Sequence, residues 1–142
     1  MRFMCIVKAT EQSEKGILPT EKEFSDMGKF NEEMARAGVM LSGDGLQPSS
    51  KGARVNFTGS QRTVTDGPFA ETKELIAGFW MIQVKSKEEA IEWMKRCPNP
   101  HPGLDTHIEI RQVYEADDFG DALTPELRER EERIRRDIEK KR

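Results

Sequence analysis

The segment Gly78–Lys85 carries apolar side chains at consecutive positions, which limits the possible folds more than any other feature of the chain. One face of the predicted strand carries Trp80, Ile82 and Val84, and the other carries Phe79 and Met81. Because strand side chains alternate between two faces, both faces of this strand need cover, which places it at the centre of its sheet. Arg2–Lys8 shows the same two-sided pattern. The sequence therefore predicts two central strands.

Helix start signals mark two further elements. Thr20 and Glu23 have the spacing of a capping box, apolar residues follow at helical spacing, and Gly38 ends the helix. Ser86 and Glu89 repeat the signal before a second helix that ends at Pro98. Shorter strands are predicted at Val39–Leu41, Ala53–Thr58, Arg62–Thr65 and Thr106–Tyr114.

The order of these elements is β-α-β, a β-hairpin, then β-α-β. This order predicts an α+β ferredoxin-like split βαβ sandwich with an inserted β-hairpin. Helices can cover only one face of such a sheet, and the other face is also apolar on both central strands. Two copies closing sheet to sheet would cover it, so we predict a homodimer that forms a dimeric α/β barrel.

The C-terminal stretch differs in composition from the rest of the chain. Residues 124–142 contain eight basic and six acidic side chains, and Thr124-Pro125 is a typical helix start. Leu127, Ile134 and Ile138 form a thin apolar stripe. We predict a domain at residues 1–116 and a charged helical extension at 117–142. The helix is either solvated or docks its stripe on the partner subunit.

Composition excludes several classes of protein. The net charge of −3 gives no electrostatic basis for a nucleic-acid partner. No apolar run approaches the ~18–20 residues of a membrane span, and no leader opens the chain, so we expect a soluble cytoplasmic protein.

Two cysteines, Cys5 and Cys97, make no disulfide framework. Two histidines with scattered acids have no metal-ligand spacing, so neither a metal nor another cofactor is expected.

Two polar groups are candidates for a site. The turn Asp66-Gly67-Pro68 leads into Glu71, Lys73 and Glu74, directly before the central strand that contains Trp80. On the last strand, Glu109 and Arg111 share a face that should point into the barrel. A charge buried there needs a partner, a ligand or water.

The candidate ligand-binding residues are therefore Asp66, Glu71, Lys73, Glu74, Trp80, Glu109 and Arg111. Arg111 and Lys73 could hold an anionic or carbonyl-bearing small molecule. Asp66, Glu109 and His107, which lies on the same strand face as Glu109, are the candidate catalytic bases. The alternative is a purely structural network in which Arg111 pairs with Glu109, Glu71 or Glu74.

The residues Asp66-Gly67-Pro68-Phe69-Ala70-Glu71-Thr72-Lys73-Glu74, with Ala77-Gly78-Phe79-Trp80 downstream, closely resemble the DGPF branch of the YCII-related family. The resemblance spans about residues 1–115 and implies the dimeric α/β-barrel fold. It also implies association with extracytoplasmic-function sigma factors, beside which such proteins are often encoded. The histidine and aspartate suspected of catalysis in the broader family are not carried over, because the first helix contains no histidine.

Two functions remain open from the sequence. The first is a small-molecule-binding or regulatory accessory protein with a pocket in the dimeric barrel. The second is an enzyme without a prosthetic group that uses an acid/base pair in the barrel. A base within hydrogen-bond reach of a ligand would favour the enzyme.

Overall fold

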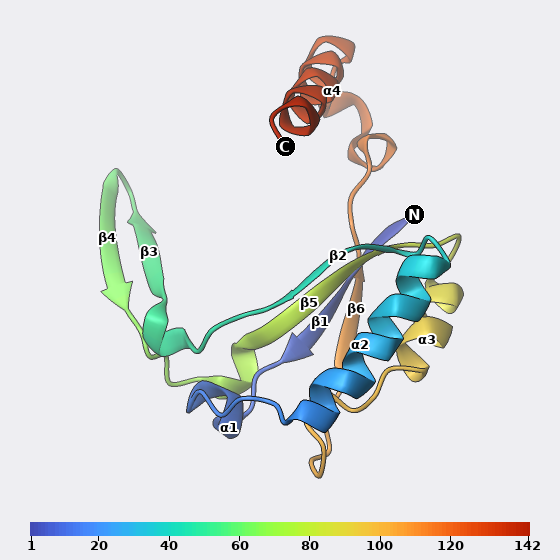
Figure 1. The fold of residues 1–142 in the computed structure, drawn as a ribbon. Coiled ribbons are helices and arrows are strands. Elements are labelled where there is room, and N and C mark those ends of the chain that lie inside the picture. The colour runs from blue at the N-terminus through green and yellow to red at the C-terminus, as the bar shows by residue number, and fades with distance from the viewer. The chain divides into compact units, whose positions relative to one another are not determined.

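The two strands predicted to be central lie at the centre of an antiparallel sheet with the strand order β2-β5-β1-β6 (Figure 1). Its strands are β1 (Arg2–Lys8), β2 (Met40–Gly45), β5 (Ile76–Gln83) and β6 (Ile108–Gln112). The computed structural model describes residues 1–142 and contains two compact units, Met1–Gln112 and Val113–Arg142. The first unit confirms the α+β ferredoxin-like fold with an inserted hairpin.

Two helices, α2 (Glu21–Arg36) and α3 (Lys87–Lys95), lie on the same side of the sheet (Figure 1). The core between them and the sheet consists of Phe3, Cys5, Val7, Phe30, Met34, Val39, Trp80, Ile82, Val84, Ala90 and Met94. Burying a side chain the size of Phe30 or Met34 contributes about 1.5–3 kcal/mol. The alternate residues of β1 and β5 point to the other side of the sheet.

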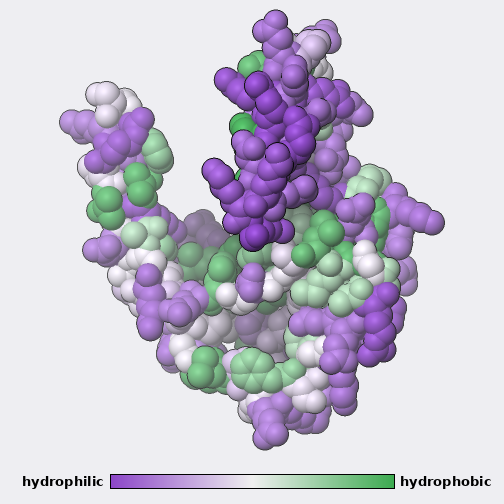
Figure 2. Space-filling model, turned by 45° about the horizontal axis from the view of Figure 1, so that its top comes forward, coloured by the Kyte–Doolittle hydropathy of each residue, from purple (hydrophilic) through white to green (hydrophobic).

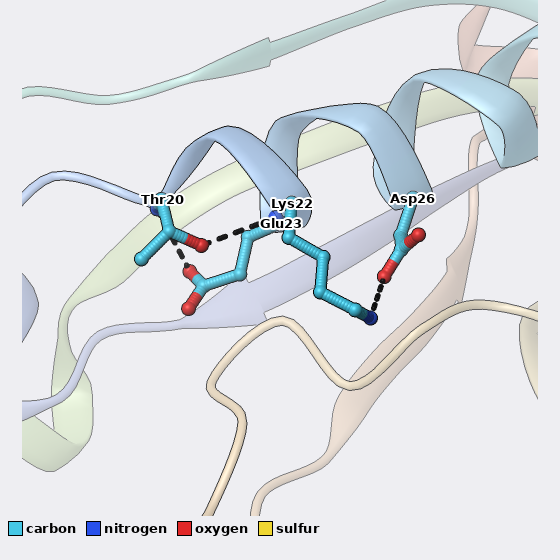
Figure 3. A network of polar contacts seen from close by, with 4 residues as sticks. All are labelled: Thr20, Lys22, Glu23 and Asp26. Carbon is cyan, nitrogen blue, oxygen red and sulfur yellow. Dashed lines mark hydrogen bonds and ion pairs between the residues drawn. The ribbon is translucent and has the colours of Figure 1, made fainter.

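Local signals fix where these helices begin. The Thr20 hydroxyl accepts from the Glu23 backbone N–H at 3.2 Å, and the Glu23 carboxylate accepts from the Thr20 N–H at 3.4 Å (Figure 3). One turn further on, the hydrogen bond from Lys22 lowers the pKa of Asp26. In α3, Ser86 caps the Glu89 N–H as predicted, but the Glu89 carboxylate accepts from the Lys85 N–H rather than from Ser86.

The inserted hairpin forms a separate sheet of two strands, β3 (Ala53–Thr58) and β4 (Gln61–Asp66), and extends away from the main sheet (Figure 1). A short helix that was not predicted, α1 (Glu11–Glu14), lies near the start of the chain. Its cap is a reciprocal pair of hydrogen bonds between Thr10 and Ser13.

The C-terminal unit contains a 3₁₀ segment, η3 (Ala116–Ala122), and α4 (Pro125–Lys140), which confirms the predicted helix. Thr124 caps α4, and Arg128 pairs with Asp117 at 2.8 Å. The side chains of the apolar stripe are exposed within this unit. None of the helices combines the length and apolar character needed to cross a membrane.

Candidate functional site

The sheet face that points away from α2 and α3 carries the polar residues predicted on the last strand. Strand register places two rows of side chains on this face: Met4 lies beside Met81 and Arg111, and Ile6 lies beside Phe79 and Glu109. Paired residues of antiparallel strands point to the same face. We call these six residues, together with Ser42 and Asp44 on β2, the open sheet face.

The open sheet face has an apolar floor between two polar margins. Met4, Ile6, Phe79 and Met81 make the floor, and all four are half-buried within one chain. Asp44 pairs in register with Phe79 and lies at the β2 margin. Glu109 and Arg111 form the β6 margin. A floor of this kind is the usual surface for an apolar group, and the margins supply directional contacts.

The two charges of the β6 margin are paired with each other. Arg111 Nη1 lies 3.4 Å from Glu109 Oε2, and the side chains of Arg111 and Glu109 are 72% and 41% exposed. An ion pair this exposed contributes at most about 1 kcal/mol. A guanidinium has five N–H donors, so most of the donors of Arg111 remain available to a ligand. His107 is exposed, and it precedes β6.

The residues around the Asp66 turn lie elsewhere within the chain. Asp66 ends β4, and Glu71, Lys73 and Glu74 are exposed in and around the short segment η2 (Thr72–Glu74). Neither an ion pair nor a hydrogen bond joins these four residues to Glu109 or Arg111. A single chain therefore does not bring together the two groups predicted to form one site.

Trp80 lies on the helix side of the sheet. Its Nε1–H donates to Asn31 Oδ1 at 2.9 Å, and its ring packs edge-on against Phe30 with centroids 5.8 Å apart. Because Trp80 is adjacent to Phe79 in a strand, its side chain points away from the open sheet face. Trp80 is therefore a core residue and does not wall a site that contains Glu109.

The structure also shows an anchor, which was not predicted from the sequence, for the loop at Asp66-Gly67-Pro68-Phe69. The Glu14 carboxylate accepts from the Ser49 backbone N–H at 3.0 Å and from the Ser49 hydroxyl. The Ser49 hydroxyl in turn accepts from the Phe69 N–H at 3.1 Å. Gly67 packs so tightly here that a Cβ would lie 1.7 Å from the Ser49 carbonyl oxygen. In the sequence, the only sign of this anchor was the pair Thr10 and Ser13, which caps the helix α1 that carries Glu14.

Two hollows occur outside the open sheet face, and neither contains a predicted site residue. The smaller, about 110 Å³, lies between the start of α2 and the proline-rich connector, with Phe24 and Pro100 in its lining. The larger, about 520 Å³, lies within the C-terminal unit, with Tyr114 and Arg135 in its lining. No three His, Cys, Asp or Glu side chains are placed to hold a metal ion together.

Comparisons with known proteins match the first unit to a domain family. Residues 1–117 match the YCII-related domain. An uncharacterised protein of Rhizobium meliloti (strain 1021), R00369, is 30% identical over 93 residues, which cover 66% of this chain and 74% of that protein.

A solved structure is similar at the level of chain trace. It is 5-chloro-2-hydroxyhydroquinone dehydrochlorinase (TftG) from Burkholderia phenoliruptrix AC1100, in complex with 2,5-dihydroxybenzoquinone. The sequence identity is 13% and the TM-score 0.47, over 83% of this chain and 98% of that chain. On the match over residues 1–117, which takes in the whole sheet, the hairpin, α2 and α3, the chain belongs to the YCII-related domain family.

Proposed function

We propose that this protein is a small-molecule-binding accessory protein, whose pocket forms when the open sheet faces of two copies close on each other. The observation that carries the proposal is the apolar floor of that face: Met4, Ile6, Phe79 and Met81 remain half-buried, because α2 and α3 both lie on the other side of the sheet. Closure between identical faces would complete their burial.

The margins of the face indicate what kind of ligand fits. Arg111 offers N–H donors in a planar fork, which suits a carboxylate or a carbonyl group. Glu109 and Asp44 offer acceptors for a ligand hydroxyl or amine. The floor suits an aromatic ring or a short alkyl chain. A small aromatic or aliphatic carboxylate therefore matches the face best.

A regulatory role is consistent with this reading. The resemblance of the Asp66–Glu74 segment to proteins encoded beside extracytoplasmic-function sigma factors supports a ligand-responsive task next to such a factor. The alternative is an enzyme that uses Asp66, His107 or Glu109 as a base. Within one chain, Glu109 alone of these three lies on the open sheet face.

The first experiment tests the closed pair of faces. We expect the wild-type protein to be a dimer by analytical ultracentrifugation, and Met81→Asp to weaken the dimer at least tenfold. The reason is that an unpaired carboxylate buried between the sheets costs several kcal/mol, and each 1.4 kcal/mol is tenfold in affinity. Ile17→Asp is the matched control, because Ile17 is 61% exposed and lies in the loop between α1 and α2, outside the strands of the sheet. A monomeric wild-type protein, or a Met81→Asp dimer of unchanged affinity, would contradict the proposal.

The second experiment tests the ligand. A panel of aromatic and short aliphatic carboxylates is screened by thermal shift against wild-type protein and Arg111→Met. We expect at least one acid to raise the melting temperature of the wild type and to have no effect on the variant, with the dimer intact in both. Each stabilising acid is then incubated with wild-type protein and with Glu109→Gln, and the mixture is analysed by mass spectrometry. Conversion by the wild type that is lost in Glu109→Gln would replace the binding function with the enzymatic alternative.

A further inference from the structure

The inserted hairpin exposes an apolar face that nothing covers within its own chain. Phe57 is 71% exposed, Val64 66% and Val55 55%. Register pairs Val55 with Val64 and Phe57 with Arg62, so all four side chains lie on the same face of the ribbon. Green side chains gather along this hairpin in Figure 2. We call these four residues the hairpin face.

The opposite face of the ribbon is polar, and it ties the hairpin together at its base. There the Asn56 side-chain amide donates to Thr65 Oγ1 at 2.8 Å, and the Arg54 guanidinium lies 3.9 Å from the centroid of the Phe69 ring. The Gly67 N–H also donates to the Gly52 carbonyl at 3.0 Å. The hairpin is thus held at its root and displays its apolar face outward.

Such a ribbon needs a second surface to be stable. Two-stranded hairpins alone are marginal in water, and an exposed ribbon with large apolar side chains is prone to association. Phe57 alone would bring roughly 110–180 Å² of surface to a contact, given its exposed fraction. This is a useful addition to the ~800 Å² per partner of a stable interface.

The charged side chains around the hairpin face indicate which surface packs against it. The Arg62 guanidinium lies 4.5 Å from the centroid of the Phe57 ring and donates to the Gly59 and Gln61 carbonyls, without an acidic partner in its own chain. A hairpin pairing with an identical hairpin would bring two Arg62 side chains together. The open sheet face instead offers an apolar floor with the acids Asp44 and Glu109 at its margins, and Asp44 forms no ion pair.

We propose that the hairpin face of each copy packs along a margin of the open sheet face of a second copy, beside the apolar floor that the two sheets cover, so that Phe57 and Arg62 complete the wall of the ligand site in trans. This inference rests on the proposed function, which supplies the sheet-to-sheet dimer. This packing would explain why the Asp66 segment lies apart from Glu109 and Arg111 within one chain. Strand β4, which ends at Asp66, would reach the site of the partner. The ligand is then held by a floor from one copy and a cationic aromatic wall from the other.

Hydroxyl-radical footprinting of the full-length protein tests the contact directly. Phe57 labelling is compared between wild-type dimer and protein diluted to the monomer. We expect at least a threefold lower labelling rate of Phe57 in the dimer. Phe24 is the internal control, since it is 62% exposed at the start of α2 and should label equally in both states. Equal labelling of Phe57 in dimer and monomer overturns the inference.

Matched variants separate this inference from the proposed function. Phe57→Ser should weaken the dimer at least tenfold while Phe24→Ser leaves its affinity unchanged, and circular dichroism should show both variants folded. Arg62→Glu should also weaken the dimer, and adding Glu109→Arg or Asp44→Arg should restore at least part of the loss. If Met81→Asp dissociates the dimer but Phe57→Ser does not, the sheet-to-sheet dimer stands and the docking of the hairpin is refuted. If Phe57→Ser dissociates it and Met81→Asp does not, the hairpin packs on another surface and both proposals fail.

Discussion

Replacing Gly67 by alanine should release residues 66–69 from the backbone at Ser49, against which Gly67 packs. An added Cβ would lie 1.7 Å from the Ser49 carbonyl oxygen and 2.6 Å from its carbonyl carbon. These are backbone atoms, which cannot rotate aside as a side chain would. Residues 66–69 must therefore move away from the segment η1 (Ser49–Lys51), and the contacts between them are lost.

The size of the effect follows from those contacts. The loop loses the hydrogen bond from Gly67 N–H to the Gly52 carbonyl and the one from Phe69 N–H to Ser49, at about 0.5–1.5 kcal/mol each. The stacking of Arg54 over Phe69 contributes about 0.5–1 kcal/mol more. Gly67→Ala should thus lower the free energy of unfolding by about 1.5–4 kcal/mol. For a chain of this length, that is a decrease in melting temperature of about 5–15 °C.

The matched control is the same substitution in α2. Gly28 has no atom within 4 Å of the position of an added Cβ, and it lies in a helix interior. Gly28→Ala should stabilise the protein by about 0.5–1 kcal/mol, because alanine is the better helix former. Both variants are measured by urea denaturation and by calorimetry. A Gly67→Ala protein as stable as wild type, or a Gly28→Ala protein that loses stability, would refute the reasoning from steric contact.

Three further predictions concern the core and a cap. Asn31→Ala leaves the Trp80 indole N–H without its acceptor and should cost about 1–3 kcal/mol in urea denaturation, so an unchanged midpoint would contradict the hydrogen bond. Burial raises the pKa of Cys5 and of Cys97 from 9.0 to about 12. The native protein should therefore react slowly with Ellman's reagent at pH 8, and rapid reaction of the native protein would contradict the burial of the two thiols. The free energy of unfolding should fall as the pH rises above 9, because only the thiols of the unfolded chain ionise there. Thr20→Ala should cost about 0.5–2 kcal/mol by calorimetry, through loss of the α2 cap, and an unchanged melting temperature would contradict the role of the cap.

Periodicity was sufficient to predict the architecture of the first unit. Arg2–Lys8 is a strand with the predicted bounds, and Ala53–Thr58 is one arm of the hairpin as predicted. The central strand β5 begins two residues before the predicted Gly78, at Ile76, where pairing with Lys8 continues past a register shift. Pairing across the sheet decides that end of the strand, and a single segment does not contain this information.

The short helix α1 was missed for a chemical reason. A capping box is recognised by Glu or Gln at the third helical position, whereas here Ser13 takes that place and bonds back to Thr10. The helix is also too short to show an apolar period. Its consequence, the bond from Ser49 to Glu14, joins residues far apart in the sequence and could be seen only in three dimensions.

The candidate site could be predicted only in part, because it depends on which face of the sheet the helices cover. Alternation places Trp80 opposite Phe79, but β5 is apolar on both faces, so alternation alone does not tell which of them meets α2. Glu109 and Arg111 were correctly placed on a common face, and they pair with each other. Their predicted nearness to the Asp66 segment depends on a second chain and stays a prediction.

The hairpin arises between two strands that are neighbours in the sheet, β2 and β5. The excursion at residues 46–75 therefore leaves and re-enters the framework at nearly the same point. Loop-closure entropy grows only slowly, by about 0.6 kcal/mol for each doubling of length. Insertions, deletions or replacements within residues 46–75 should therefore cost the main sheet little stability. Proteins that share this sheet could differ in ligand choice because they carry different insertions at this point.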